Sequence, residues 1–549
     1  MSRNVTDQLS EGVLTALTTI GAEPPADLLW EVPREEFHGD YATNAAMSLA
    51  KSARRRPREL AELIARHLPP LPAVDRIEVA GPGFLNVFLN PDWCREALRD
   101  VLASGDSYGR GNLGEGTRVR IEFVSANPTG PLVIVSARAA AVGDSLARIL
   151  RFQGYTVFTE YYVNDAGSQF QTLSRSLEVR VRQALGEAVE LPENAYPGDY
   201  LVDLAKEWLG THGPSDLQAS DLPDRLGRFA VERIVSGQRK VLGDYGVEFD
   251  RWVSESIEVR RQQLPERAID LLAAKGLTYE AESALWFRSS EFGDEKDRVL
   301  RRSGGELTYF AADIAYHLFK FDGVDRVIDL LGPDHHGYIP RLRAALIALG
   351  KSADAFDGLI VQLVTLLRGG QPVRMSKRKG EFVLMEELIE EVGKDAARFT
   401  FLTRRHDSPL EFDLDVATSR SAENPVYYVQ YCHARISSIF HQLAERKLAA
   451  PDWGIVDLRP LALPEELGLI KRLLRFPDLV AGAARALEPH RIAYYLQELA
   501  AVFHPYYNRH RVISEDMPLT RARLALVAGV RQVVRNGLSL LGVSAPEKM

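Results

Sequence analysis

The feature that most constrains the fold of this chain is a strand–helix–strand pattern between residues 117 and 163. Residues 117–124 and 155–163 are rich in β-branched and aromatic residues, and residues 137–153 form an apolar, alanine-rich helical segment between them. Two strands that are connected by one helix run parallel, and a parallel sheet is covered on both faces. The pattern therefore predicts an α/β domain built around a parallel sheet.

The first hundred residues have the pattern of a separate, small α+β domain. The expected helices are at 7–20, 41–50 and 57–67, and the expected strands are at 76–80 and 84–89. Five glycines among residues 104–116 are typical of a linker. We therefore expect the first domain to cover residues 1–105.

The remaining residues divide into a sheet domain and a helical domain. Residues 106–415 alternate strand and helix patterns, with a charged, mostly helical insertion at about 170–260. Beyond these residues the strand signals end, and apolar residues such as Leu467, Ile470 and Leu473 recur at helical spacing. Residues 416–549 are therefore expected to form an all-α bundle.

The turn that follows the first strand of the predicted parallel sheet carries candidate binding residues. Ligands of an open parallel sheet bind at the carboxyl ends of its strands, so Glu122, Ser125 and Asn127 are expected to face one. The small residues nearby that let a ligand approach the backbone closely are Pro128, Thr129 and Gly130. An ordinary polar turn between a strand and a helix is the alternative interpretation.

A second candidate is the compact cationic segment at residues 374–380, which ends in a glycine. Lys377 in its centre can follow the negative charge of a triphosphate as pyrophosphate leaves. A solvated basic turn is the alternative, but residues 121–144 have the layout of a nucleotide-binding strand, loop and helix, which favours the functional interpretation. We predict that Arg374, Ser376 and Lys377 take part in catalysis.

A third candidate is the pair formed by Tyr309 and Asp313. These residues stand four positions apart and would share one face of a helix. A carboxylate beside an aromatic ring suits a cation, and a guanidinium best, because it can be bound through two hydrogen bonds and stacked on the ring. The alternative is a surface aspartate beside a core tyrosine.

Two further motifs are weaker. Residues 332–337 contain adjacent histidines, but adjacent histidines on a loop rarely bind one ion and no third ligand is evident, so a nucleotide or substrate contact is favoured over a metal site. Residues 430–435 bring polar and aromatic groups together, among them Tyr431 and Arg435. A buried, hydrogen-bonded helix start explains this second motif equally well.

Composition excludes several other classes of protein. The chain has 549 residues and a net charge of −8, which argues against nonspecific nucleic-acid binding, although the basic run at 51–58 is a candidate for a local binding face. Cys94 and Cys432 form neither a disulfide framework nor a metal-ligand spacing, and they fit a reducing cytoplasm. Neither a secretory signal nor an apolar run of about 18 residues is visible, so we expect no membrane segment.

Taken together, these segments resemble the arginyl-tRNA synthetases, which are class I aminoacyl-tRNA synthetases that join arginine to its tRNA with ATP. The order and spacing of the motifs carry the resemblance. The matching segments are residues 39–44, 80–86, 125–132, 162–167, 309–317, 332–338, 375–377, 424–431 and 545–549. The resemblance implies a Rossmann-like parallel-sheet core, a small N-terminal α+β domain that contacts the tRNA elbow, and a C-terminal all-α bundle that binds the anticodon.

The resemblance also implies roles for the candidate residues. Those that would contact the amino acid are Glu122, Ser125 and Asn127, and those that would bind its guanidinium are Tyr309 and Asp313. Those that would hold ATP, which carries Mg²⁺, are Pro128, Thr129, Gly130, Met375 and Lys377. The tRNA-binding candidates are Asn44, Tyr431 and Arg435. The implied partners are tRNA(Arg), L-arginine and ATP, and we expect a cytoplasmic monomer.

One segment departs from the family. Where the family has His-Val-Gly-His, this chain has Val133, Ile134, Val135 and Ser136. In the family both histidines donate hydrogen bonds to the ATP phosphates, whereas aliphatic side chains donate none. The loss of one such donor costs about 3–4 kcal/mol of transition-state stabilisation. We therefore expect slow adenylate formation, and we expect Ser136 to cap the following helix.

The sequence leaves three interpretations of this departure open. In the first, the chain is a non-catalytic paralogue that binds arginine or tRNA. In the second, it retains weak ligation through Lys377 and backbone donors at the helix start. In the third, compensating frameshifts altered the segment and kept its length. A different nucleotidyl-transfer enzyme on the same scaffold is disfavoured, because Tyr309 and Asp313 are both present. Our principal prediction is an arginine–tRNA ligase, and the non-catalytic paralogue is the alternative.

Overall fold

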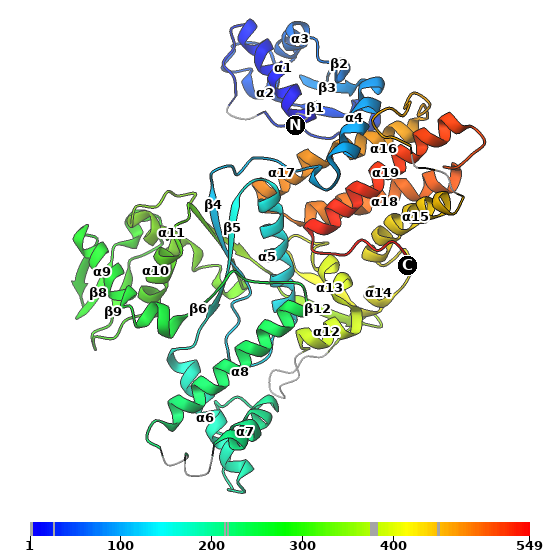
Figure 1. Cartoon of the computed structure of the whole chain (residues 1–549). Helices are drawn as coiled ribbons and strands as arrows, with labels where there is room; N and C mark the ends of the chain where they lie inside the picture. The colour runs from blue at the N-terminus through cyan, green and yellow to red at the C-terminus, as the bar shows by residue number, and fades with distance from the viewer. Residues whose placement is uncertain are drawn as a thin grey trace.

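The computed structural model describes residues 4–25, 28–212, 216, 219–373, 383–446, 449 and 451–549. A small α+β part lies at the top of Figure 1, the parallel-sheet part occupies the left and centre, and a helical bundle lies at the right. A helical insertion projects downward from the sheet part. Among the described residues, no helix combines the length and the apolar character that crossing a membrane requires.

The N-terminal part is a three-stranded antiparallel sheet with helices packed on it. Its elements are α1 (Val5–Thr19), η1 (Glu36–His38), β1 (Tyr41–Thr43), α2 (Ala45–Leu49), α3 (Pro57–His67), β2 (Val74–Ala80), β3 (Phe84–Leu89) and α4 (Pro91–Ser104). α3 and β3 have the predicted bounds. The helix predicted at 41–50 is wrong in its first half, because β1 is fully buried and pairs with β3.

The centre of the molecule is a five-stranded, all-parallel sheet with the order β11-β10-β4-β5-β6. Its strands are β4 (Arg118–Glu122), β5 (Thr156–Val163), β6 (Arg251–Ser254), β10 (Arg326–Leu331) and β11 (Phe356–Ile360). This is the doubly wound arrangement, in which the order along the chain reverses between β4 and β10. The predicted strand–helix–strand unit is confirmed, because β4 and β5 pair in parallel across α5 (Ile134–Phe152).

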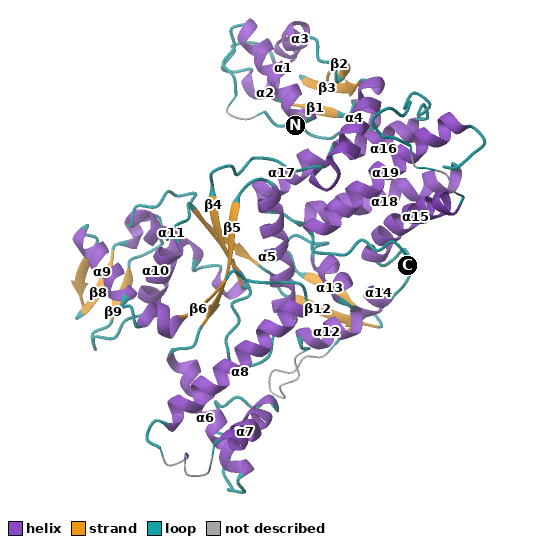
Figure 2. Cartoon of the chain, viewed as in Figure 1, coloured by secondary structure: helices purple, strands orange, loops and turns teal. Residues whose placement is uncertain are grey.

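Helices cover both faces of this sheet. Val327 and Ile328 are adjacent on β10 and belong to two different apolar clusters, so both faces are buried. Figure 2 shows α10 (Tyr309–Lys320) and α11 (Ile339–Ala348) on one side of the sheet and α5 on the other. The remaining elements that accompany the sheet are η4 (Glu255–Arg260), α9 (Leu264–Ala274), β7 (Thr278–Ala281), β8 (Ala284–Phe287), η5 (Ser289–Phe292), β9 (Arg298–Arg301), η6 (Pro333–His335), β12 (Val364–Arg368), β13 (Gln371–Pro372), α12 (Met385–Val392), α13 (Lys394–Phe401) and β14 (Leu410–Asp413).

Three helices between β5 and β6 form the insertion. They are α6 (Gly167–Ala184), α7 (Tyr200–Thr211) and α8 (Leu222–Asp244). Leu173, Trp208 and Leu226 belong to a separate apolar cluster that these helices share. The insertion therefore has a core of its own, and the inner end of α8 returns to the sheet.

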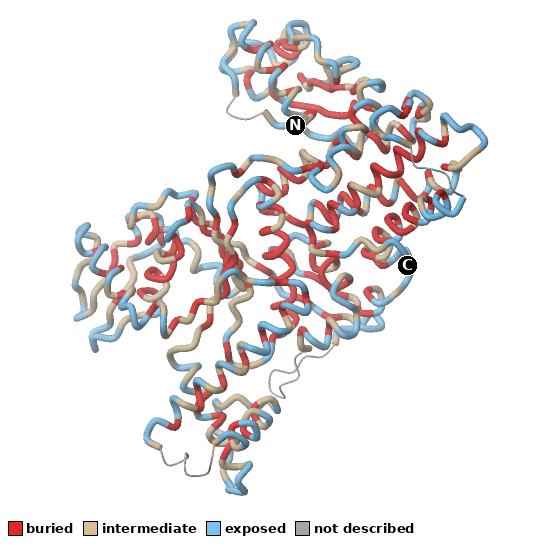
Figure 3. The backbone as a smooth tube through the Cα atoms, viewed as in Figure 1, coloured by how far each residue is buried: buried red, intermediate tan, exposed pale blue. Residues whose placement is uncertain are grey.

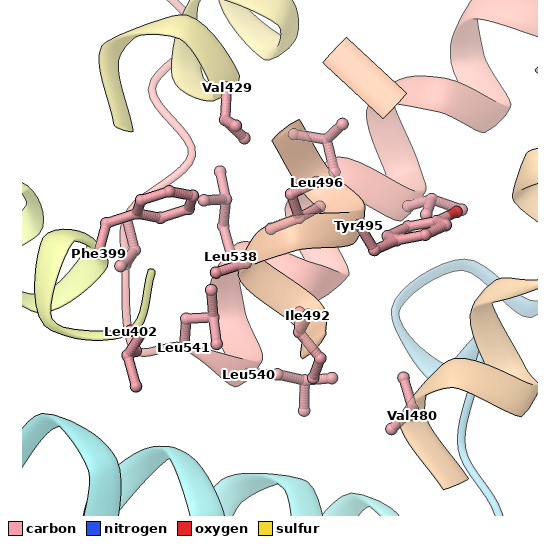
Figure 4. Close-up of a cluster of buried hydrophobic side chains, with 14 of the residues drawn as sticks. Phe399, Leu402, Val429, Val480, Ile492, Tyr495, Leu496, Leu538, Leu540 and Leu541 are labelled. Carbon is pink, nitrogen blue, oxygen red and sulfur yellow. The ribbon is translucent and has the colours of Figure 1, made fainter. Parts of the chain in front are cut away.

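The C-terminal part is a bundle of helices, as predicted. Its elements are α15 (Pro425–Glu445), α16 (Pro464–Leu474), α17 (Phe476–Ala486), α18 (His490–Arg509) and α19 (Met517–Leu540). The short helix α14 (Leu414–Thr418), which precedes them, packs against β12, α12 and α13 of the sheet part. In Figure 3 the buried stretches follow the inner sides of these helices and the strands of the central sheet. Figure 4 shows Phe399 and Leu402, which come from α13 and its end, close to Leu538 and Leu541 at the end of α19. The bundle core is therefore continuous with the sheet part.

The segment predicted to be a linker is packed between parts of the molecule. η2 (Gly105–Ser107) contacts α19, and the buried hydroxyl of Tyr108 donates to the carbonyl of Leu473 at 3.0 Å. Gly109 has a φ of +93°, and a Cβ atom at this position would lie 2.7 Å from the ring of Phe476. The glycines of this segment therefore permit a close approach between helices, rather than a free connection.

A fully buried arginine joins the sheet part to the end of the chain. Arg398 on α13 donates from Nε to the carbonyl of Leu541 at 3.1 Å and from NH1 to that of Tyr245 at 3.3 Å, and it forms an ion pair with Asp144 on α5. Gly542 follows with a φ of +66°, and a Cβ atom there would collide with the guanidinium of Arg398. The C-terminal turn therefore depends on glycine at this position.

The contact between the N-terminal part and the bundle predicts a pH-dependent stability. Asp478 on α17 accepts a hydrogen bond from the Thr6 hydroxyl, and burial raises the pKa of Asp478 from 3.8 to about 6. The folded protein holds this proton more tightly than the unfolded chain does. The resulting contribution to the free energy of unfolding, about 3 kcal/mol, is fully present below about pH 4 and is lost as the pH rises through 6. We expect Asp478→Asn to have a higher calorimetric Tm than the parent protein at pH 8. Its Tm should also fall much less between pH 5 and 8.

The exposed Asp270 supplies a matched control for this substitution. Asp270→Asn should leave the pH dependence of Tm unchanged. A lower Tm of Asp478→Asn at pH 8 would contradict the assignment.

Candidate active site

The candidate site lies at the carboxyl edge of the central sheet. β4 continues into α5, whereas β10 continues into α11, and these helices lie on opposite faces of the sheet. A crevice between diverging connections is where ligands bind in this type of fold. Residues 123–132 after β4 and residues 332–338 after β10 are therefore the segments that border the site.

Three acidic residues lie side by side on neighbouring strands at this edge. Asp329 on β10 is in register with Glu122 on β4, and Glu122 is in register with Glu160 on β5. All three are buried. Adjacent strands are only about 4.8 Å apart, so these carboxylates require a counter-charge or protons.

The counter-charge comes from α10. Lys320 Nζ lies 2.5 Å from Glu122 Oε2 and 2.7 Å from Asp329 Oδ2. The Tyr316 hydroxyl lies 2.8 Å from Glu122 Oε2 and 2.7 Å from Glu160 Oε1. Glu122, which we predicted to face a ligand, is therefore held beneath the crevice by two partners within the chain.

The pKa shifts of this cluster follow from burial and from charge. Burial alone lowers the pKa of Lys320, but the carboxylates of Asp329 and Glu122 outweigh this effect and raise it to about 12. Burial alone raises the pKa of Asp329, but Lys320 and His317 hold it well below its ordinary value. Burial raises the pKa of Glu160. Lys320 is therefore a permanent cation among the acids.

The predicted guanidinium-binding pair lies on the same helix. Tyr309 is 66% exposed, and its hydroxyl lies 3.5 Å from Ser168 Oγ. Asp313 accepts a hydrogen bond from the Tyr338 hydroxyl, and burial raises the pKa of Asp313. A cavity of about 510 Å³ lies beside Tyr309. An exposed ring that lines an open cavity and a shielded carboxylate thus stand one helical turn apart on α10.

A second carboxylate that the sequence analysis missed lies close to this pair. Glu255 is buried, it makes a hydrogen bond with Tyr162, and its charge adds to burial in raising the pKa of Asp313. Arg260, which lines the cavity, donates to Glu255 Oε1 from Nε at 2.7 Å. A guanidinium therefore already occupies part of this acidic group. Glu255 follows β6 directly, but β6 was not predicted, so its position at the sheet edge was not recognised.

The loop after β4 has a strained backbone. Val124 and Ser125 have φ values of 68° and 38°, which non-glycine residues rarely adopt and which cost about 1–3 kcal/mol each. Ser125 Oγ accepts a hydrogen bond from the Tyr162 N–H at 3.0 Å, and Asn127 is exposed. Such strain persists only where surrounding contacts fix the conformation.

Helices of the insertion supply those contacts. The Tyr200 hydroxyl on α7 donates to the carbonyl of Thr129, and Gln238 Nε2 on α8 donates to the carbonyl of Gly130 at 2.9 Å. Pro128, which stands between Asn127 and Thr129, is buried. The predicted binding residues at 125–130 are therefore brought to one edge of the site by the sheet on one side and the insertion on the other.

The aliphatic segment at 133–136 lies at the start of α5. The helix begins at Ile134, three residues before the predicted start, so Val133 occupies the N-cap position and makes no side-chain cap. The prediction that Ser136 caps this helix is wrong. Ser136 lies inside the first turn, where its N–H donates to the carbonyl of Val133 at 2.8 Å. Val135 is half-buried and packs against the core.

Backbone hydrogen bonds join this segment to the chain around residue 384. The Ile134 N–H donates to the carbonyl of Val383 at 3.2 Å, and the Met385 N–H donates to that of Leu132 at 2.9 Å. Because only backbone atoms take part, this pairing does not depend on which side chains occupy 133–136. The predicted catalytic and ATP-binding residues Arg374, Met375, Ser376 and Lys377 lie outside the described residues.

The predicted tRNA-binding residues lie far from the sheet edge. Tyr431 on α15 is 36% exposed and stacks on Tyr427 with ring centroids 5.8 Å apart. The Arg435 guanidinium lies over the rings of Tyr431 and Tyr507, at 5.1 and 4.3 Å. Asn44, at the start of α2, is exposed. Within the part of the chain that the structure describes, no group of three His, Cys, Asp or Glu residues is placed to hold a metal ion. His335 and His336 therefore belong to no such group.

Comparisons with known proteins agree with this architecture. The matching family models are the Arginyl tRNA synthetase N terminal domain at residues 7–89, the tRNA synthetases class I (R), catalytic domain at 97–196 and the DALR anticodon binding domain at 429–549. The arginyl-tRNA synthetase of Thermus thermophilus superposes with a TM-score of 0.80 at 25% identity, covering 99% of this chain and 100% of that one. Methionyl-tRNA synthetase of Mycobacterium tuberculosis shares the fold, with a TM-score of 0.55 at 13% identity over 77% of this chain and 91% of that one. The fold and the position of the site define a class I aminoacyl-tRNA synthetase.

Sequence relatives specify the member of this class. The chain is 51% identical to the arginine–tRNA ligase of Desulfosudis oleivorans over 529 residues, which cover 95% of each chain. It is 50% identical to that of Syntrophotalea carbinolica over 526 residues, or 94% of each chain. The chain belongs to the arginyl-tRNA synthetase family.

The buried cation of the sheet edge gives a stability prediction. Lys320→Met would leave the carboxylates of Glu122 and Asp329 without their counter-charge, and breaking such a buried pair costs about 3–5 kcal/mol. We expect a correspondingly lower Tm at pH 7, with part of the loss recovered in the double variant Lys320→Met/Asp329→Asn. Lys206→Met, at an exposed lysine, should leave Tm unchanged. A Tm of Lys320→Met equal to that of the parent protein would contradict the proposed charge balance.

Proposed function

We infer that this chain is an arginine–tRNA ligase, which activates arginine with ATP and transfers it to the 3′ end of tRNA. The inference rests on 51% and 50% sequence identity to two arginine–tRNA ligases over nearly the whole chain. The carboxylates of Asp313 and Glu255 support arginine as the amino acid, and Glu255 is linked to the cavity beside Tyr309 through its bond to Arg260. Carboxylates bind a guanidinium through paired hydrogen bonds, and a neighbouring ring such as that of Tyr309 can stack on it.

The reaction has two steps. In the first, a carboxylate oxygen of arginine attacks the α-phosphorus of ATP, and the bond to pyrophosphate breaks to leave arginyl-AMP. In the second, a hydroxyl of the terminal tRNA ribose attacks the arginyl carbonyl and loses its proton, and AMP leaves. We propose that Mg²⁺ enters with ATP.

We propose that the loop after β4 binds the reacting end of arginine and part of ATP. Ser125 and Asn127 stand at the carboxyl edge of the sheet, where Ser125 is fixed by the Tyr162 N–H and Asn127 is exposed. Glu122 lies on β4 just before this loop and is paired with Lys320. The proposed ATP contacts are Pro128, Thr129, Gly130, Met375 and Lys377, and the proposed catalytic residues are Lys377, Ser376 and Arg374.

We expect Glu255→Gln to raise the KM for arginine by about 10–100-fold, because a charged acceptor that binds a guanidinium contributes about 1.5–3 kcal/mol. Arginine activation in this family requires tRNA, so the measurement is tRNA-dependent pyrophosphate exchange. Glu306→Gln, at the exposed rim of the same cavity, should change KM by less than about threefold. Calorimetric binding should favour arginine over the neutral analogue citrulline. An unchanged KM in Glu255→Gln, or a preference for citrulline, would contradict the assignment of this pocket.

We propose that the segment at 133–136 limits the rate of the first step. The side chains of Val133 and Val135 donate no hydrogen bonds to a phosphate. The backbone does not compensate fully, because the N–H groups of Ile134 and Ser136 donate to Val383 and Val133 within the protein. Two of the donors that the helix start could offer to a phosphate are therefore already in use.

Restoring the family residues tests this proposal. The variant Val133→His/Val135→Gly/Ser136→His should raise tRNA-dependent exchange by roughly 100-fold or more, since each phosphate-directed donor contributes about 10²–10³ in rate. Ser136→Ala removes a hydroxyl without adding an imidazole and should leave the rate unchanged. Equal rates in the parent and the triple variant would show that another step is limiting. Arginine binding without exchange in either protein would favour a non-catalytic paralogue.

We propose that the two ends of the chain bind tRNA. The ring of Tyr431 with the guanidinium of Arg435 forms an exposed stacking surface that suits an unpaired base. Asn44 and the basic run at 51–58 lie on the N-terminal part, at a distance that a large tRNA can span. We also propose the domain division 1–105, 106–415 and 416–549.

The proposed setting is a cytoplasmic monomer. The buried, free Cys94 and Cys432 suit a reducing compartment.

A further inference from the structure

One side chain of the insertion reaches into the loop that the proposed function places against the substrates. Gln238 on α8 is only 2% exposed, and it is a long polar side chain in an otherwise apolar helix–sheet junction. A buried amide is costly unless its hydrogen-bonding groups are all used. Its partners therefore show what the side chain does.

Each end of this amide bonds to the loop or to a residue that bonds to the loop. Gln238 Nε2 donates to the carbonyl of Gly130 at 2.9 Å and to that of Asn127 at 3.3 Å. Gln238 Oε1 accepts from the Tyr161 hydroxyl at 2.9 Å. The same hydroxyl accepts from the Ala126 N–H at 3.1 Å. The two carbonyl acceptors require the NH₂ group on their side, so the network fixes the orientation of the amide.

The network joins two ends of a strained segment. Val124 and Ser125, with their left-handed backbone, directly precede Ala126, which Tyr161 holds. Gly130 is held at the other end by Gln238. Together with the contacts of Tyr200 and Tyr162, these bonds oppose relaxation of the loop toward ordinary φ values.

We propose that Gln238 is a positioning residue, through which the helical insertion holds the loop at 124–130 in its substrate-binding conformation. This proposal rests on the proposed ligase function for its kinetic consequence. Gln238 touches no substrate in this scheme. It acts through Asn127 and Gly130, so its loss should change how well substrates are bound and aligned, rather than the chemistry of any one group.

The surroundings make a clean substitution feasible. A cavity of about 350 Å³ lies beside Gln238. Its apolar lining includes Pro131, Leu132, Leu204, Ile234 and Val241. Methionine has a similar length, lacks hydrogen-bonding groups of comparable strength and adapts to irregular space. Gln238→Met therefore removes the hydrogen bonds and keeps the packing.

The insertion also offers a matched control. Gln183 at the end of α6 is another glutamine whose Nε2 donates to a backbone carbonyl, that of Val189, at 2.6 Å. This contact lies within the insertion and does not involve the loop. Gln183→Met removes the same type of bond from the same structural part.

The first test is kinetic, by tRNA-dependent pyrophosphate exchange well below the Tm of each protein. We expect Gln238→Met to raise the KM for arginine by at least about tenfold, because small displacements of binding groups have effects of this size. Gln183→Met should keep the parent KM. Gln238→Glu retains the acceptor but loses the donor, and it should resemble Gln238→Met. A purely structural role would lower Tm or the active fraction and leave KM unchanged, and that result would overturn the proposal.

The second test does not depend on catalysis. Hydrogen–deuterium exchange of a peptide covering 124–130 should be faster in Gln238→Met than in the parent protein. The carbonyl of Gly130 loses its donor, and the Tyr161 hydroxyl that accepts from the Ala126 N–H loses the acceptor that fixes it. Gln183→Met should leave uptake in this peptide unchanged. A parent protein with no pyrophosphate-exchange activity would refute the ligase function, and deuterium uptake would still test whether Gln238 holds the loop. Equal uptake in Gln238→Met and the parent would overturn the positioning role of Gln238.

Discussion

The ammonium of Lys320 is the interaction on which the arrangement of the site depends. Three adjacent strands end in buried acids, and this cation, with the hydroxyl of Tyr316, bridges Glu122 and Asp329, while Arg120 lies beside Glu160. The same contacts fix the position of α10 across the sheet edge. Because Asp313 lies two turns earlier on that helix, the location of the proposed arginine pocket follows from the position of a lysine on the same helix. Stability and specificity are therefore coupled at this edge.

The sequence was sufficient for the architecture and for part of the site. The alternation of β4, α5 and β5 predicted the parallel sheet, and the spacing of Tyr309 and Asp313 predicted a shared helix. Other features depend on pairing between distant residues. β10 is placed beside β4 by contacts across about 200 positions, so the row of acids could not be foreseen. The short strand β1 was mistaken for helix, because its sheet partners overrode local propensity.

The aliphatic segment at the start of α5 shows how a site can change while its scaffold stays intact. Ile134 and Met385 join the two neighbouring segments through backbone groups, and Val133 begins the helix without a side-chain cap. Nothing in this local fold requires an imidazole. The chain can therefore keep the fold that it shares with the arginyl-tRNA synthetase of Thermus thermophilus whatever side chains occupy 133–136. Overall similarity and the chemistry of one short segment are separate properties here.

The bond from Arg398 to the carbonyl of Leu541 has a consequence for biosynthesis. Asp144 on the helix that follows β4 shares its charge with Arg398, whose other partners are the carbonyls of Tyr245 and Leu541. Leu541 is synthesised 143 residues after Arg398. Until the turn at Leu541 has been made and has packed against α13, the nascent protein therefore carries this guanidinium incompletely paired. A truncation that removes this turn should destabilise the catalytic core far more than its length would suggest.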